Sequence, residues 1–194
     1  ARARLKADPA IAPLVQERYW GPWPDATQLA SLPPGSLGHV YGHLLADQGL
    51  ETLPPPEIPP GADGDATYLQ RRIRACHDVW HAISGCPTTL AGEAALNGLT
   101  TEQLRWPGTA LLLAADLIHR VDEAETPGAS GVDVGLAIAY GLELGASTRS
   151  PLLAQRWEEA WERPLADWRE ELGLTALIMR NPFTAGQNNG ADRG

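Results

Sequence analysis

Helical spacing of apolar residues is the feature of this sequence that most restricts its fold. Leu37, Val40, Tyr41, Leu44 and Leu45, for example, would share one face of a helix. No stretch alternates convincingly between apolar and polar residues over four to eight positions, as a half-buried strand would. We therefore predict an all-α protein, a single-domain helical bundle of roughly seven to nine helices.

The predicted domain covers residues 1–183 and contains one long interruption. Residues 53–64 hold five prolines with little periodicity, and they predict an ordered loop or a linker. If ordered, a loop of this length is expected to cover something. The polar segment 184–194 predicts a disordered tail.

The charge balance limits the partners of the chain. Its 194 residues carry a formal net charge of −9. Because binding to phosphate groups needs a basic face, we expect no nucleic-acid partner. No apolar run approaches the roughly 18 residues that would cross a bilayer. The chain has a single lysine, Lys6, and abundant alanine, glycine and proline, which favours a bacterial source with a GC-rich genome.

One stretch near the middle of the chain combines several metal-ligating side chains. His77 and His81 are spaced i, i+4, which places both imidazoles on one face of a helix, one turn apart. Asp78 lies about 100° around the helix from His77. Glu93 follows beyond a helix stop and turn at residues 84–87, so it can face the histidines from a second helix.

Two imidazoles and two carboxylates make a plausible site for a divalent metal ion. Such ligands suit zinc, iron, manganese or cobalt better than calcium, but the residue types do not distinguish among these four metals. Asp78 either ligates the ion directly or orients a histidine. The alternative is a purely structural pair of histidines, which helical spacing alone often produces.

Three arginines lie one to two turns before the candidate ligands. Arg71, Arg72 and Arg74 could receive a substrate carboxylate through paired hydrogen bonds. Arg74, three residues before His77, is better placed by rotation than Arg72. The alternative is a solvated basic face paired with surface acids.

Two further sets of metal-ligating residue types have structural explanations that we prefer. His39 and His43 are also spaced i, i+4, but no nearby carboxylate of equal promise accompanies them, so we favour partly exposed helical histidines over a second metal pair. Cys76 and Cys86 flank the motif, and we favour reduced, buried cysteines over zinc thiolates.

Three further helices are expected after the one that carries Glu93, and the first two of them are apolar. Residues 109–125 are apolar on nearly all sides and predict either the core helix, which we prefer, or the wall of an apolar pocket. Residues 131–146 are rich in glycine and alanine, which allows close approach of another helix or contact with lipid. Pro151 opens a closing helix, kinked or restarted at Pro164, that continues to Leu172.

Three segments of the chain resemble the Coq-four family of ubiquinone (coenzyme Q) biosynthesis. The stretch from Tyr68 to Glu93 resembles the family's HDxxH-x11-E signature, through Tyr68, Arg72, Arg74, His77-Asp78-x-x-His81, Gly85, Pro87-Thr88 and Gly92-Glu93. Residues 32–45 resemble the family's PxGSLG…Y…FL segment. Residues 156–175 resemble its closing helix, through Arg156-Trp157-Glu158, Trp161, Pro164-Leu165, Arg169 and Glu171-Leu172-Gly173-Leu174-Thr175.

The resemblance implies an all-helical fold with a metal-containing active site. It implies that His77, Asp78, His81 and Glu93 are metal ligands, with zinc most often assumed, and that Tyr68, Arg72 and Arg74 bind substrate. It implies a metal-dependent carboxy-lyase or oxidative decarboxylase acting at ring carbon one of a polyprenyl-hydroxybenzoate. The carboxylate would leave with or without replacement by hydroxyl, and the helices of residues 109–125 and 131–146 would hold the prenyl tail.

The resemblance also implies partners and a location. We expect a prenylated aromatic acid or isoprenoid lipid as ligand and other quinone-biosynthesis enzymes as partners. We expect the protein in the bacterial cytoplasm, peripherally on the inner face of the membrane. A homodimer through apolar helix faces is a further expectation. Two alternatives stay open: a non-catalytic lipid-binding scaffold of a ubiquinone-synthesis complex, and a helical structural protein with a fortuitous motif.

Overall fold

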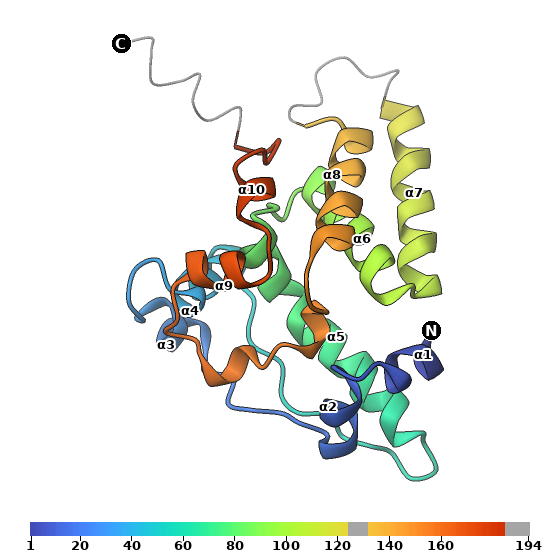
Figure 1. The fold of residues 1–194 in the computed structure, drawn as a ribbon, viewed down its shortest axis with the longest axis vertical. Helices are drawn as coiled ribbons and strands as arrows, with labels where there is room; N and C mark the ends of the chain where they lie inside the picture. Colours follow the sequence, from blue (N-terminus) through green and yellow to red (C-terminus); the bar gives the residue numbers. More distant parts are fainter. Residues whose placement is uncertain (124–131, 185–194) are drawn as a thin grey trace. The chain divides into compact units, whose positions relative to one another are not determined.

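The structure, a computed structural model, describes residues 1–123 and 132–184 and is built from helices (Figure 1). These two ranges contain ten α-helices, two 3₁₀ helices and no strand, which confirms the all-α prediction. The α-helices are α1 (Arg2–Ala7), α2 (Ala12–Glu17), α3 (Ala26–Ala30), α4 (Leu37–Gln48), α5 (Gly64–Ser84), α6 (Leu90–Leu104), α7 (Pro107–Glu123), α8 (Val134–Ser147), α9 (Leu165–Glu171) and α10 (Thr175–Ile178). Four of them, α1, α2, α3 and α10, have only four to six residues, which brings the number slightly above our expectation.

The chain divides into two compact units. The motif unit comprises Arg2–Ile83 and Arg149–Leu172, and the α6–α8 unit comprises Ser84–Thr148 and Gly173–Gly194, together with Ala1. The expectation of one domain over residues 1–183 stays a prediction. The expected disordered tail lies outside the described residues from residue 185 onward.

Helix α5 carries the candidate motif, and local chemistry fixes both of its ends. The carboxylate of Asp63 accepts the backbone N–H groups of Asp65 and Ala66, each at 3.1 Å, and thereby caps the start of the helix. At the other end Gly85 takes a left-handed φ of 68°, which glycine adopts without strain. The helix stop predicted at residues 84–87 is therefore confirmed.

The closing segment of the motif unit differs from the prediction. Two 3₁₀ turns, Leu152–Ala154 and Trp157–Glu159, replace the helix expected to begin at Pro151, whereas the restart predicted at Pro164 is confirmed by α9, which begins at Leu165. The backbone carbonyls of Leu153 and Gln155 accept hydrogen bonds from the guanidinium of Arg72 on α5. A continuous α-helix would have used those carbonyls for its own ladder.

The N-terminal segment of α4 packs against this closing segment. The backbone N–H of Gly38 donates to the carbonyl of Trp161 at 2.8 Å, and the Trp161 ring stacks on Tyr41 with centroids 5.6 Å apart. Trp161 also donates its indole N–H to the carbonyl of Pro22. Two segments more than a hundred residues apart are thus joined around the first turn of α4.

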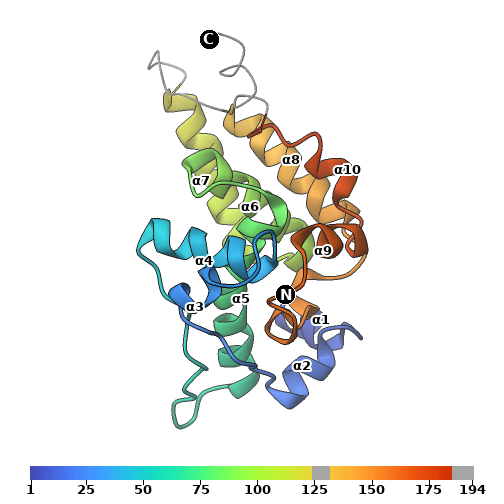
Figure 2. The same ribbon diagram turned by 90° about the vertical axis from the view of Figure 1, so that its left-hand side faces the viewer.

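In the α6–α8 unit, α6 and α8 lie side by side in both views (Figures 1 and 2). Glycines allow this approach: a methyl group at Gly98 would lie 2.8 Å from the carbonyl oxygen of Ile138, and one at Gly141 would collide with the carbonyl of Ala95. The close helix approach predicted for residues 131–146 is confirmed.

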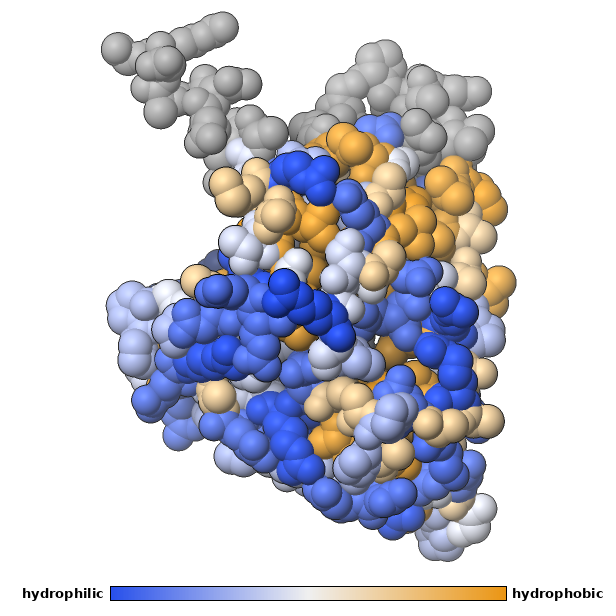
Figure 3. All heavy atoms as spheres, viewed as in Figure 1, coloured by the Kyte–Doolittle hydropathy of each residue, from blue (hydrophilic) through white to orange (hydrophobic). Residues whose placement is uncertain are grey.

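Helix α7 has the reverse polarity of a core helix: large apolar residues are exposed and an acidic residue in its middle is buried. The buried Asp116 faces inward and accepts a 3.0 Å hydrogen bond from the side-chain amide of Asn97. Leu111 and Ile118 are 73% and 64% exposed, and Leu112 and Leu117 are also exposed. Figure 3 shows apolar side chains gathered over α7 and α8. The preferred prediction of a core helix at residues 109–125 is therefore wrong. Among the described residues, no helix is long and apolar enough to span a bilayer.

Candidate metal centre

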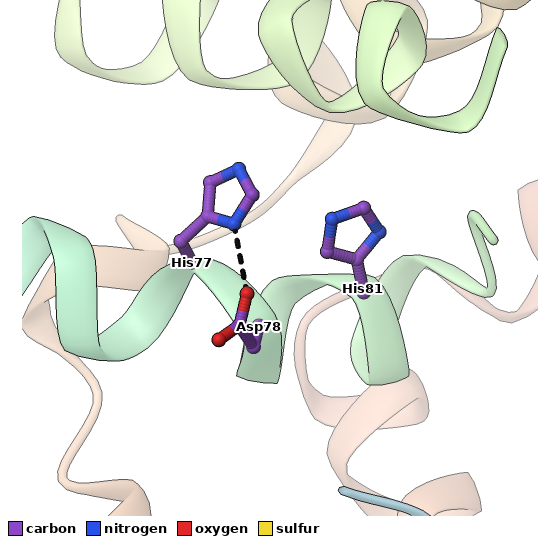
Figure 4. A group of neighbouring side chains, drawn as sticks. All are labelled: His77, Asp78 and His81. Carbon is purple, nitrogen blue, oxygen red and sulfur yellow. Dashed lines mark hydrogen bonds and ion pairs between the residues drawn. The ribbon is translucent and has the colours of Figure 1, made fainter. Parts of the chain in front are cut away.

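Three side chains of the candidate motif lie together on α5 (Figure 4). His77, Asp78 and His81 each offer a ligand atom, and these atoms all lie within 4.8 Å of one another. The two imidazoles point to the same side of the helix, with ring centroids 5.0 Å apart and planes at 73°. His81 is buried, whereas His77 and Asp78 are half-buried. The helical spacing therefore brings together three of the four side chains that the sequence predicted to converge.

Asp78 contacts the first histidine directly. Its Oδ1 lies 3.1 Å from Nδ1 of His77. When Nδ1 carries the proton it donates to the carboxylate, and Nε2 becomes the coordinating atom. Carboxylates commonly orient metal-bound histidines in this way. The contact favours the orienting role of Asp78, while direct ligation stays a prediction.

The residues present fit a divalent transition metal. Two imidazole nitrogens and a carboxylate oxygen are the donor types that zinc and its neighbours prefer. Ligand atoms around a tetrahedral zinc ion are about 3.3 Å apart, given bonds of about 2.0–2.1 Å. Donors already within 4.8 Å need only small side-chain rotations to reach that separation.

Glu93 lies in the other unit. It is half-buried in the first turn of α6, where Thr89 caps the helix by accepting the backbone N–H of Gly92. Its role as a fourth ligand stays a prediction from the motif alone.

The two cysteines are buried and form no disulfide. Burial raises the pKa of Cys76 to about 12 and that of Cys86 to about 11, so both thiols stay protonated near neutral pH. The metal-ligating group found on the described residues does not include them. These observations favour the reduced, buried cysteines that we expected over zinc thiolates.

Two of the predicted substrate-binding residues are enclosed by protein. Arg72 is 1% exposed, and its NH1 lies 2.7 Å from Oε1 of the equally buried Glu158. Tyr68 is fully buried and donates its hydroxyl to the carbonyl of Tyr19 at 2.9 Å. Both side chains hold other segments onto α5, so the structure gives no support to a substrate-binding role for either.

Arg74, in contrast, faces solvent one turn before His77. It lines a hollow of about 690 Å³ between α5 and the proline-rich loop, together with Pro54, Pro55, Pro56, Glu57, Thr67, Gln70 and Arg71. The loop is fixed to the helix because Nε of Arg71 donates to the carbonyl of Pro54 at 2.9 Å. The hollow has the volume of a small-molecule site. The prediction that this loop is ordered and covers something is supported.

Sequence reasoning missed how Glu158 and Arg169 support the motif helix. Glu158 pairs with Arg72, and Arg169 donates to the carbonyls of Ala82 and Ile83 in the last turn of α5, at 3.0 and 2.9 Å. An arginine at this position satisfies carbonyls that a helix end leaves unpaired. The only signal in the sequence was that both residues belong to the closing segment that resembles a known family.

Comparisons with known proteins agree with that resemblance. Residues 15–177 match the family described as coenzyme Q (ubiquinone) biosynthesis protein Coq4. A ubiquinone biosynthesis protein coq4, mitochondrial, from Talaromyces stipitatus is 32% identical over 148 residues, which are 76% of this chain and 49% of that protein. The COQ4 protein of Eremothecium gossypii is 31% identical over 151 residues, 77% of this chain and 45% of that protein. This chain thus spans about half the length of the curated relatives it matches.

A solved structure shares the fold. The crystal structure of a protein from Nostoc punctiforme PCC 73102, assigned provisionally to ubiquinone biosynthesis, superposes with a TM-score of 0.75 at 28% identity. The superposition covers 90% of this chain and 79% of that one. Since the family match runs from α2 to α10 and includes the motif on α5, this chain belongs to the Coq4 family.

Proposed function

We propose that this protein is a metal-dependent enzyme of ubiquinone or related prenylquinone biosynthesis. Its substrate would be a polyprenyl-hydroxybenzoate, from which it removes the carboxylate at ring carbon one. The observation that carries the proposal is the convergence of His77, Asp78 and His81 on one side of α5. Membership of the Coq4 family supports the pathway.

The residues of the candidate metal centre would have distinct roles in this reaction. His77 and His81 would hold the ion together with Glu93, the further predicted ligand, and Asp78 would fix the ring of His77. When bound, the ion would supply Lewis acidity at a substrate oxygen. In the redox-neutral version, the bond to the carboxylate breaks, carbon dioxide leaves, and ring carbon one keeps the electron pair and takes up a proton. The hydroxylating version would need dioxygen as oxidant.

Arg74 is the residue that we propose for the substrate carboxylate. It is exposed, lies three residues before His77 on α5, and lines the hollow beneath the proline-rich loop. A guanidinium can bind a carboxylate through two parallel hydrogen bonds, which fixes the orientation of the ring. Arg72, whose donors are used by Glu158 and two carbonyls, is not needed for this role.

The outward face of α7 supports contact with lipid. Leu111, Leu112, Leu117 and Ile118 are all exposed, while the one acid described in the middle of the helix, Asp116, faces inward. A helix with its apolar residues outward suits an isoprenoid tail or the surface of a bilayer. Peripheral attachment to the bacterial inner membrane is therefore part of the proposal. Alternatively, a second copy of the chain or another quinone-biosynthesis enzyme would bury this face in a protein–protein interface. The curated relatives are named as mitochondrial proteins.

Metal analysis and complementation together test the proposal. The wild-type chain should carry one ion that His81→Ala loses, and a strain lacking its own enzyme should make quinone with the wild type but not with His77→Ala, His81→Ala or Glu93→Ala. Arg74→Ala should keep the metal and lose turnover, while Arg74→Lys should recover part of it. Full quinone production by the metal-free variants would reject the enzyme and favour the scaffold.

A further inference from the structure

A second pair of histidines lies outside the candidate metal centre. His39 and His43 are one turn apart on α4, with ring centroids 4.5 Å apart and planes at 73°. His77 and His81 on α5 have centroids 5.0 Å apart and planes at the same angle. The two pairs, which account for four of the five histidines in the chain, therefore hold their imidazoles in nearly the same relation.

The first histidine of each pair is also oriented in the same way. Nδ1 of His39 lies 2.8 Å from the backbone carbonyl of Ala30, and Nδ1 of His77 lies 3.1 Å from the carboxylate of Asp78. A carbonyl oxygen can only accept, so Nδ1 of His39 donates to it, and Nε2 is the ring nitrogen left to bind a metal ion. Metal-binding histidines typically donate their other N–H to such an oxygen.

The fold holds this arrangement in place. Ala30 is the last residue of α3, so its carbonyl is among those that a helix end leaves without a backbone partner. Gly42, between the two histidines, brings α4 close to α3, because a methyl group there would collide with the backbone nitrogen of Ala30. The orientation of His39 is thus set by the packing of two helices.

The pair is open to ions from solution. His39 is half-buried and His43 is exposed. Among the described residues, the only group of three metal-ligating side chains is the one on α5, so the α4 pair would supply two protein ligands. Water would complete the coordination.

The sequence alone favoured partly exposed helical histidines at positions 39 and 43. From the oriented ring of His39 and its closeness to the exposed His43, we propose instead that the two form a second binding site for a divalent transition metal ion, separate from the centre on α5. Imidazole donors select copper, nickel, cobalt and zinc over magnesium and calcium, and affinity should be highest for Cu²⁺. This inference does not rest on the proposed function, because none of its residues belongs to the candidate metal centre.

Equilibrium dialysis of the full chain against Cu²⁺ tests the site. The double variant His77→Ala/His81→Ala should still bind one Cu²⁺ whose electron paramagnetic resonance shows nitrogen coupling from imidazole. Adding His43→Gln should remove that ion, and excess Mg²⁺ should not displace it. Because His43 is exposed and the bond of His39 to Ala30 is untouched, this substitution should leave the helical circular dichroism unchanged.

Two controls make the result decisive. Gln48→Ala, on the exposed end of α4, should leave the bound Cu²⁺ in place. His43→Gln in the otherwise unchanged chain should lower the bound copper by one ion and leave the ion lost in His81→Ala. Unaltered copper binding after His43→Gln, equal loss with Gln48→Ala, or no copper in the His77→Ala/His81→Ala variant would each overturn the proposal.

Discussion

Replacing Glu158 by leucine should destabilise the motif unit strongly. The ion pair between Arg72 and Glu158 has an N–O distance of 2.7 Å, and the two side chains are 1% and 0% exposed. In Glu158→Leu the guanidinium would stay charged, since arginine does not lose its proton in proteins. It would be buried with only the carbonyls of Leu153 and Gln155 as acceptors.

The geometry gives the expected size of the effect. Removing one partner of a buried ion pair costs about 3–5 kcal/mol, and the two remaining acceptors place Glu158→Leu near the lower end, at about 3 kcal/mol. Arg72→Met should cost more, because it leaves a buried carboxylate unpaired and also strips the two carbonyls of their donor. The double variant buries no charge, so its cost should fall to about 1–3 kcal/mol, mainly from the carbonyl of Gln155, whose bond is 2.7 Å long.

Urea unfolding followed by tryptophan fluorescence measures these differences in the right unit, because every tryptophan except Trp106 lies in the motif unit. The free energies of unfolding should rank wild type, double variant, Glu158→Leu and Arg72→Met from most to least stable. A cost below about 1 kcal/mol for Glu158→Leu would refute the reasoning. So would an Arg72→Met protein of normal stability without activity, because that result would return Arg72 to the substrate site.

Three more predictions follow from other parts of the molecule. Gly141→Ala should lower the free energy of unfolding by about 1–3 kcal/mol, because its methyl group would collide with the carbonyl of Ala95. Gly108→Ala on α7, whose methyl group would meet only the Trp106 side chain, should change it little, and thermal melts compare the two variants. The double variant Leu111→Asp/Ile118→Asp should reduce co-flotation with lipid vesicles about a hundredfold while leaving circular dichroism unchanged. The control Leu50→Asp, at an exposed leucine of the motif unit, should have no effect. Undiminished flotation of the double variant would exclude the α7 face as the lipid-binding surface. The free energy of unfolding should fall as pH rises from about 9 towards 11–12. The unfolded state then releases the thiol protons of Cys76 and Cys86, whereas the folded state, in which burial raises both pKa values, retains them. Denaturant titrations at a series of alkaline pH values measure this change, and a free energy of unfolding that stays constant would contradict it.

Local chemistry explains which parts of the structure the sequence could predict. The spacing of His77 and His81 brings two imidazoles together on any helix, and Gly85 and Thr89 mark helix ends through their own backbone and side-chain preferences. The pairing of Arg72 with Glu158 joins positions 86 apart, and no local pattern encodes such a contact. The exposure of α7 was missed for a related reason: an apolar helix looks the same in sequence whether protein or lipid covers it.

Resemblance to a family does not separate residues that hold the motif helix from residues that act on a substrate. Outside the motif, Glu158 holds Arg72, and Arg169 donates to two carbonyls in the last turn of α5, one and two residues after His81. Substituting either residue would remove a contact that holds the helix of the candidate ligands, and would therefore lower the proposed activity even if neither residue touches substrate. Arg74 differs, because it is exposed beside the hollow and can be changed without opening a buried contact. It is therefore the position at which a loss of turnover with unchanged stability identifies a role in substrate binding.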